Sequence, residues 1–222
     1  MHTNSLPKKM NSFAPDQICV GVLHAPLDRV REGVRFQLER TIKDGSICTE
    51  LTRVNWNDFF DSDGILYDIS RFQIAIFSIQ ENITIYICNL SDGWVSLYGN
   101  LVVECEMDAF FFRATNLAKA KYKVFEMIGW RQGALERHVR ALQDDIGWTF
   151  LNNGTPFSFE LSDRYNKYRI SARIDLSLIK TYSARAGYDL SEITDFNGVC
   201  CRFWREYKDR SGPSGDIRRH YT

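Results

Sequence analysis

The sequence predicts an α+β fold in which a mixed, largely antiparallel sheet packs against amphipathic helices. Short β-branched and aromatic runs follow one another along the chain, and segments with the apolar period of a helix stand between them. No internal repeat of fixed length is present. With 222 residues, of which 44% are hydrophobic and 25% are charged, the chain can bury one core without disulfides or metals.

The first part of the chain contains a predicted strand, a helix and a second strand. Residues 18–23 form a β-branched run that is typical of a buried strand. A helix follows, because Pro26 suits a first helical turn and apolar residues recur on one face as far as a stop at residues 43–45. Residues 47–54 are the next predicted strand, and residues 55–64 are an acidic, aromatic loop.

The middle of the chain predicts a hairpin followed by a helix. Residues 73–79 and 83–90 are strand-like, and the three polar residues between them give the spacing of a hairpin. Residues 94–105 have the clearest helical period in the sequence, with apolar residues at i, i+3, i+4, i+7, i+8 and i+11. Ser91 or Asp92 would cap the start of this helix.

Two further strands, residues 109–114 and 122–128, should pair with that hairpin. A helix is expected over residues 131–145, with Gly147 as its stop. The apolar stripe that predicts this helix consists of Leu135, Val139, Leu142 and Ile146.

The last part of the chain predicts a hairpin, a helix and a strand. Residues 148–150 and 157–159 alternate apolar and polar residues on either side of an Asn-Asn-Gly turn. A helix over residues 176–186 ends at Gly187, and residues 199–207 alternate like a strand.

We expect a single α+β domain over residues 15–208, with a candidate subdivision near residues 118–130. Residues 1–14 are a predicted disordered start, and residues 209–222 are a predicted mobile basic tail. No apolar run approaches the roughly 18 residues of a membrane span, and the first residues lack the apolar segment of a secretory signal. These features predict a cytoplasmic protein without a leader.

The six cysteines show no metal-ligand or redox spacing, so we expect buried free thiols in a reducing compartment. Cys200 and Cys201 are adjacent, and the simplest interpretation places them on opposite faces of a strand. Asp61-Ser62-Asp63-Gly64 resembles a calcium loop, but Phe59 stands where the first ligand is needed. The sequence has no phosphate-binding loop, dinucleotide motif or nucleophile elbow, so we expect no catalytic residue, metal or cofactor.

Charge changes sign along the chain, although the formal net charge is zero. Residues 1–43 carry a net charge of +3, residues 44–118 carry −8 and residues 119–222 carry +5. This layout indicates either a charged partner for the acidic middle third or pairing within the chain. In the second case, arginines of the last third such as Arg137, Arg140 or Arg169 would neutralise the acids.

The acids of the middle third gather in two clusters. The first interleaves carboxylates with two phenylalanines in the predicted loop, which suits an interface anchored by apolar rings and steered by charge. In the alternative interpretation, the rings fill the protein's own core and the acids are only solvated. The residues expected at the contact are Asp58, Phe59, Phe60, Asp61, Asp63 and Asp68 in the first cluster, and Glu104 and Asp108 in the second.

Two segments carry a family resemblance: Asn89-Leu90-Ser91-Asp92-Gly93-Trp94, and Gly147-Trp148-Thr149-Phe150 with Phe157-x-Phe159-Glu160. In these segments, and over residues 73–188 more broadly, the chain resembles immunity proteins of type VI secretion and other polymorphic toxin systems of bacteria. The resemblance implies a non-enzymatic protein that blocks a cognate effector toxin by covering its active site or preventing its assembly. It transfers no individual binding residue, because such interfaces differ between pairs.

We therefore expect an immunity protein that neutralises a cytosolic effector toxin. A nuclease is the expected target, because carboxylates can occupy a basic cleft where phosphates would sit. Neither a membrane nor nucleic acid is expected as a partner. The alternative function is a nucleic-acid-associated regulator that uses the basic C-terminal third, with Tyr165, Tyr168 and Trp204 as stacking groups. An enzyme with a motif outside those considered is the third hypothesis.

Overall fold

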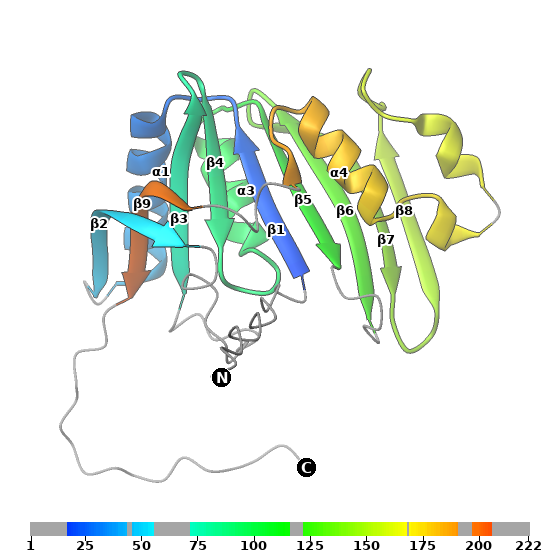
Figure 1. Ribbon diagram of the computed structural model, residues 1–222, viewed down its shortest axis with the longest axis horizontal. Coiled ribbons are helices and arrows are strands. Elements are labelled where there is room, and N and C mark those ends of the chain that lie inside the picture. The colour runs from blue at the N-terminus through cyan, green and yellow to red at the C-terminus, as the bar shows by residue number, and fades with distance from the viewer. Residues whose placement is uncertain are drawn as a thin grey trace, which may run out of the picture.

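The computed structural model describes residues 17–43, 46–55, 72–115, 122–167, 169–190 and 197–205. Its centre is a nine-stranded sheet in which every pair of neighbouring strands is antiparallel. Helices cover both faces of the sheet (Figure 1). The predicted α+β class with a largely antiparallel sheet is confirmed. The predicted terminal segments, residues 1–14 and 209–222, lie outside the described residues.

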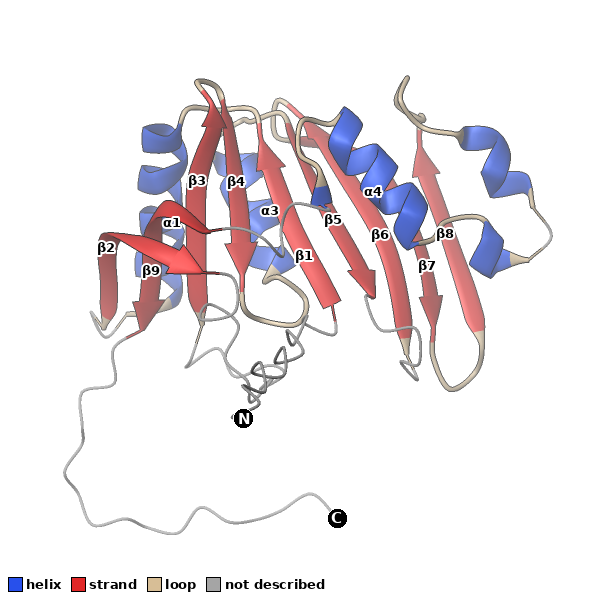
Figure 2. Ribbon diagram, in the orientation of Figure 1, coloured by secondary structure: helices blue, strands red, loops and turns tan. Residues whose placement is uncertain are grey.

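The sheet has the order β2-β9-β3-β4-β1-β5-β6-β7-β8, so β2 and β8 are its two edges (Figure 2). The strands are β1 (Gln17–Leu23), β2 (Ile47–Asn55), β3 (Gln73–Gln80), β4 (Ile83–Cys88), β5 (Ala109–Thr115), β6 (Lys123–Arg131), β7 (Ala134–Gln143), β8 (Trp148–Gly154) and β9 (Asn197–Arg205). Within the described ranges, the α-helices are α1 (Leu27–Thr41), α3 (Val95–Glu104) and α4 (Leu176–Arg185), and the short 3₁₀ helices are η2 (Ser162–Asn166) and η3 (Ile170–Ala172).

Two hydrophobic clusters lie on opposite sides of the sheet. Helices α1 and α3 pack on one side, here called the back face, and α4 packs on the front face, across β5 and β6 (Figure 1). The alternation of β1 serves both clusters: Ile18, Val20 and Val22 join the front cluster, and Cys19 and Leu23 join the back cluster. A central strand that is buried on both faces reads as a continuous apolar run.

Helix α3 approaches β1 closely because β1 has a glycine at the contact. A Cβ atom on Gly21 would lie 2.0 Å from the Tyr98 ring, so any side chain there would push α3 away. The Tyr98 hydroxyl then reaches backbone carbonyl oxygens on two strands, at 3.1 Å from Val22 and 2.9 Å from Phe110. This pairing fixes α3, and therefore the segment that follows it, against the sheet.

Most predicted elements are confirmed: β1, α1, β2, the β3–β4 hairpin, α3, β5, α4 and β9 all stand where the sequence places them. Asp92 is the residue that caps the turn before α3, since its Oδ1 accepts a hydrogen bond from the Trp94 backbone N–H at 2.9 Å. One detail of pairing is wrong. β5 and β6 do not pair with the β3–β4 hairpin, because β1 lies between β4 and β5 and pairs with both.

The predicted helix over residues 131–145 is also wrong. This segment is β7, which forms a hairpin with β6. Gln132 and Gly133 make the turn with φ angles of 47° and 76°, the left-handed values that two-residue hairpin turns require. The apolar stripe does not face a core as a helix would, because Val139 is buried whereas Leu135 is 56% exposed. Pairing with β6 overrides the local helical pattern.

The predicted hairpin between residues 148–150 and 157–159 is wrong in its second half. β8 pairs with β7 rather than with residues 157–159. Those residues form no strand, because the chain turns there: the Glu160 backbone N–H donates to the Phe157 carbonyl oxygen at 3.0 Å. The Phe157 N–H in turn donates to the Glu160 carboxylate at 2.8 Å. A side-chain contact therefore replaces the strand ladder that the alternation predicted.

Candidate binding surface

The first predicted contact cluster lies outside the described residues, so its assignment stays a prediction. Its members are Asp58, Phe59, Phe60, Asp61, Asp63 and Asp68. The candidate calcium loop at residues 61–64 falls in the same part of the chain.

The second cluster lies where α3 ends and β5 begins. Glu104 is the last residue of α3, and Asp108 immediately precedes β5. Between them, Glu106 adds a third exposed acid, and we call these three residues the acidic corner. The turn is fixed by two backbone hydrogen bonds. The Glu106 N–H donates to the Val103 carbonyl oxygen at 3.2 Å, and the Met107 N–H donates to the Val102 carbonyl oxygen at 3.1 Å.

Glu106 has a left-handed backbone conformation, with φ of 48°. This position after a helix normally holds glycine, because a side chain there costs about 1 kcal/mol. The turn of the β6–β7 hairpin packs against the Glu106 backbone: a Cβ on Gly133 would lie 3.2 Å from the Glu106 Cα. Among the described residues, no hydrogen bond or ion pair is formed by the Glu106 carboxylate, which is exposed.

The other two acids of the corner have partners within the chain. Glu104 forms an ion pair with Arg40 of α1, so part of the second cluster is neutralised internally. Asp108 Oδ1 accepts a hydrogen bond from the Gln132 backbone N–H at 2.7 Å, and the residue remains exposed. Arg29 of α1 also reaches the corner and donates to the carbonyl oxygen of Cys105. The open negative charge of the corner therefore rests on Glu106 and Asp108.

The arginines considered for neutralising the acidic middle third have different partners. Arg137 pairs with Glu160, and Arg140 lies 3.8 Å from a carboxylate oxygen of Glu126. Arg169 forms no ion pair within the described part of the chain. Glu160 and Glu126 belong to the last third themselves. Arg202 of that third does reach the acidic middle third, since its Nη1 lies 3.5 Å from Glu50 Oε1.

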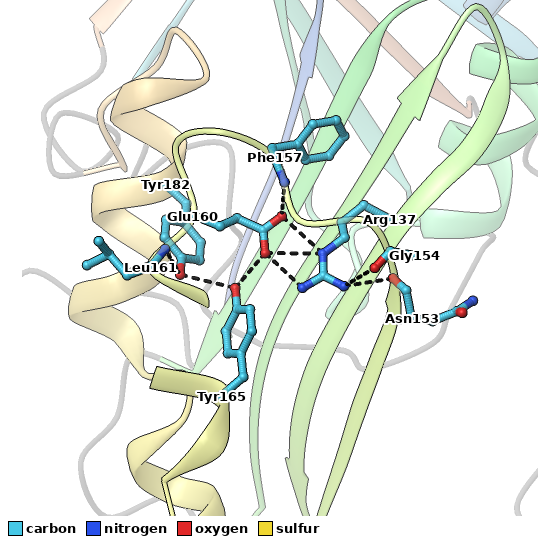
Figure 3. A network of polar contacts seen from close by, with 8 residues as sticks. All are labelled: Arg137, Asn153, Gly154, Phe157, Glu160, Leu161, Tyr165 and Tyr182. Atoms are coloured by element: carbon cyan, nitrogen blue, oxygen red, sulfur yellow. Dashed lines mark hydrogen bonds and ion pairs between the residues drawn. The ribbon is translucent and has the colours of Figure 1, made fainter. Parts of the chain in front are cut away.

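The Arg137–Glu160 pair is buried and fastens the segment that follows β8. Both side chains have no exposed surface, and Arg137 Nη2 lies 2.8 Å from Glu160 Oε2. Arg137 Nε donates to the two carboxylate oxygens at 3.0 and 3.1 Å. Its Nη1 donates to the carbonyl oxygens of Asn153 and Gly154, both at 2.9 Å, as Figure 3 shows. A guanidinium satisfied in this way bridges β7, β8 and the following turn.

Two tyrosines complete the surroundings of Glu160 (Figure 3). The Tyr165 hydroxyl donates to Glu160 Oε2 at 2.7 Å, and it also hydrogen-bonds with the Tyr182 hydroxyl at 3.1 Å. The Leu161 backbone N–H donates to the Tyr182 oxygen at 2.8 Å. Burial first, and then the neighbouring Tyr182 and Glu160, raise the pKa of Tyr165, so its hydroxyl stays a proton donor. The network ties η2 and α4 to the sheet.

This network was not predictable from composition, although Glu160 belongs to the motif that carries the family resemblance. It also corrects one expectation of the nucleic-acid alternative. Tyr165 is only 4% exposed and cannot stack on a base. Trp204 lies under the Arg202 guanidinium, which is 5.0 Å from its ring centroid, and Tyr168 lies outside the described residues.

A second charged cluster lies on the back face of β5, β6 and β7. The buried Glu126 carboxylate is 2.9 Å from Arg113 Nη2 and 2.8 Å from His138 Nε2. Burial alone would raise the pKa of Glu126, but the His138 hydrogen bond and the charges of Arg113, His138 and Arg140 outweigh burial. The pKa of Glu126 is therefore lowered from 4.5. Strand register brings the cluster together, with Arg113 and Arg140 directly opposite Glu126.

The cysteines are free, as expected, but not all are buried. Burial raises the pKa of Cys88 to about 12 and that of Cys200 to about 11. Cys200 joins the front cluster and Cys201 the back cluster, which confirms their placement on opposite faces of β9. Buried thiols are Cys19, Cys88, Cys200 and Cys201, whereas Cys48 and Cys105 are partly exposed.

An open hollow of about 600 Å³ lies at the C-terminal end of β8. Residues 154–158 line it together with Arg131 and Glu136, whose side chains form an ion pair at 3.5 Å. In the described part of the chain, no three side chains of the metal-binding types come together as a cluster. No helix among the same residues is long and apolar enough to cross a membrane.

Comparison with protein-family models, with characterised proteins and with solved structures finds no match to this chain.

Proposed function

We propose that the protein is an immunity protein, a non-enzymatic cytoplasmic protein that binds and neutralises a cognate effector toxin. The acidic middle third and the family resemblance support this function. A nuclease is the proposed target, because an anionic surface is complementary to the basic cleft that binds phosphates.

One observation carries the proposed docking site: Glu106 holds an exposed carboxylate in a conformation that glycine would adopt more easily. Residues kept in unfavourable backbone conformations cluster at functional sites. The turn that holds Glu106 is bonded to α3 and packed by the β6–β7 hairpin, so the backbone that carries the carboxylate is fixed before a partner arrives. A preorganised group loses less conformational entropy on binding. Asp108, two residues further on, adds a second fixed negative charge.

The nucleic-acid alternative receives less support. Arg137 is buried, Arg164 pairs with Asp175 at 2.9 Å, and Arg173 lies over the Phe150 ring. Cations with such partners are less available for neutralising phosphates.

Titration calorimetry against the protein encoded by the adjacent gene tests the proposed function. We expect binding that weakens as salt concentration rises, and protection of cells that express the toxin. The double variant Glu106→Lys/Asp108→Lys should bind at least about tenfold more weakly, because two attractive charges become repulsive. The matched control is Glu81→Lys, which changes an exposed acid in the β3–β4 turn. Equal affinity of the double variant and the wild type would remove the docking site, and absence of binding by the wild type would remove the function.

A further inference from the structure

The two edges of the sheet differ in how they are protected. Natural proteins place charges, prolines or bulges on edge strands, because bare edges pair with other chains. β2 carries Glu50 and Arg53 on its nine residues. β8 is seven residues long, with the sequence WTFLNNG, and has neither a charge nor a proline. On the side away from β7, the described residues place no other strand.

The outer backbone of β8 also lacks internal partners over most of its length. Among the described residues, the hydrogen bonds beyond the β7 ladder that reach its backbone come from Arg137, and they fall on the last two carbonyl groups, Asn153 and Gly154. Helix η3 packs against β8, with its Ile170 in the front cluster. The outward N–H and C=O groups between Trp148 and Asn152 thus form a row that another strand can complete.

An apolar side chain stands at the N-terminal end of this edge. Ile146 lies in the turn between β7 and β8 and is 97% exposed. The turn is rigid, because Asp144 Oδ1 accepts hydrogen bonds from the backbone N–H groups of Ile146 at 2.9 Å and Gly147 at 3.1 Å. Turn positions usually hold polar residues. A fully exposed isoleucine on a fixed turn is a preorganised apolar anchor.

The hollow at residues 154–158 stands at the opposite end of the same strand. In an antiparallel pair of β8 strands related by a two-fold axis at Leu151, residues equally far before and after the axis face each other. Ile146 precedes Leu151 by five residues and Pro156 follows it by five. Ile146 of each copy would therefore face the hollow of the other copy. If the axis lies at Phe150 instead, Ile146 faces Gly154, which also lines the hollow.

We propose that the β8 edge is the self-association surface of this protein, on which a second copy docks by antiparallel β8–β8 pairing with Ile146 seated in the hollow of the other copy. Two copies of the same edge strand can pair in antiparallel fashion, because the backbone N–H groups of each copy face the C=O groups of the other. Since β8 is uncharged, this pairing brings no like charges together. The turn adds the Asp144 carboxylate near Arg131 of the other copy. The Arg131 side chain is 60% exposed, whereas that of its ion-pair partner Glu136 is 37% exposed. This inference does not depend on the proposed toxin partner.

Sedimentation velocity of the full chain under reducing conditions tests the pairing. Between roughly 1 and 200 µM, a range in which weak dimers form, the mass should rise from 25.8 kDa toward twice that value. Ile146→Asp should weaken the dimer at least about tenfold, and Asn152→Lys should weaken it by charging the edge. The matched control is Leu51→Asp on β2, which changes an apolar residue that is 69% exposed and should leave the dimer intact.

Hydrogen exchange of the same samples locates the contact. Those amides of residues 148–152 that point away from β7 should become protected as concentration rises, and this protection should be lost in Ile146→Asp. The circular dichroism of Ile146→Asp should match the wild type, because the side chain is exposed. A monomer at every concentration would overturn the inference. A dimer that survives Ile146→Asp and Asn152→Lys, or that Leu51→Asp dissociates, would overturn it as well.

Discussion

Removing the guanidinium of Arg137 should destabilise the fold strongly. In Arg137→Met the aliphatic volume is largely kept, but the Glu160 carboxylate loses its cation at a site with no exposed side-chain surface. The carbonyl oxygens of Asn153 and Gly154 lose their donor as well. Breaking a buried ion pair by removing one partner costs about 3–5 kcal/mol. For a domain of this size, that loss lowers the melting temperature by about 6–20 °C.

Urea unfolding followed by fluorescence gives the free energies needed for a double-mutant cycle. Glu160→Leu alone should also destabilise, because it leaves Arg137 buried without its anion. The double variant Arg137→Met/Glu160→Leu should lose less than the sum of the two single losses, by about 2–3 kcal/mol.

Arg140→Met is the matched control for this cycle. Its side chain is 37% exposed and lies 3.8 Å from its carboxylate partner, so its loss should stay below about 1 kcal/mol. If Arg137→Met costs no more than Arg140→Met, or if the two single losses are additive, the network does not fasten this half of the fold.

Three further results are expected. Gly21→Ala should destabilise the protein by about 1–3 kcal/mol, since its Cβ would lie 2.0 Å from a tyrosine ring of α3. Gly99→Ala is the control, because a Cβ there meets no atom nearer than 3.8 Å, and it should stabilise the protein by about 0.5–1 kcal/mol. Equal shifts of the melting temperature in the two variants would contradict the packing of α3 on β1. The pKa of Glu126 is lowered from 4.5 in the folded protein, so the contribution of its carboxylate to the free energy of unfolding is complete above pH 4.5 and is lost as pH falls through the lower folded pKa. The difference in free energy of unfolding between wild type and Glu126→Gln should therefore shrink below pH 4.5. A difference that stays constant with pH would contradict the lowered pKa. Alkylation of the native protein at about pH 8 should modify Cys105 before Cys88, whose pKa burial raises to about 12, and the reverse order in mass spectra would contradict their placement.

The sequence predicts the strands and helices that have one unambiguous pattern. Residues 94–105 show a sustained helical period, and the structure has α3 there. The apolar residues of 131–145 fit both the period of a helix and the alternation of a strand. The turn at Gln132 and Gly133 is the feature that indicates a strand hairpin rather than a helix. Turn chemistry of this kind is local and was available in the sequence. The insertion of β1 between β4 and β5 was not, because strand order depends on contacts between distant segments.

The candidate surface was predictable in composition but not in geometry. The sequence places acids at Glu104 and Asp108, but it does not show that Arg40, 64 residues earlier, neutralises Glu104. Glu106 belongs to the second acidic cluster by sequence, but it was not among the expected contact residues, because its left-handed conformation follows from how α3 ends against the β6–β7 hairpin. A signal was present, since no glycine stands between α3 and β5 to end the helix.

The most direct test of the proposed function is the affinity of Glu106→Gly for the protein encoded by the adjacent gene, the proposed toxin. Glycine relieves the left-handed strain, so the variant should be more stable by about 1 kcal/mol. It also removes the exposed carboxylate, so the dissociation constant measured by calorimetry should rise by about fivefold or more. A variant that is more stable and binds the toxin as tightly as the wild type would contradict the account.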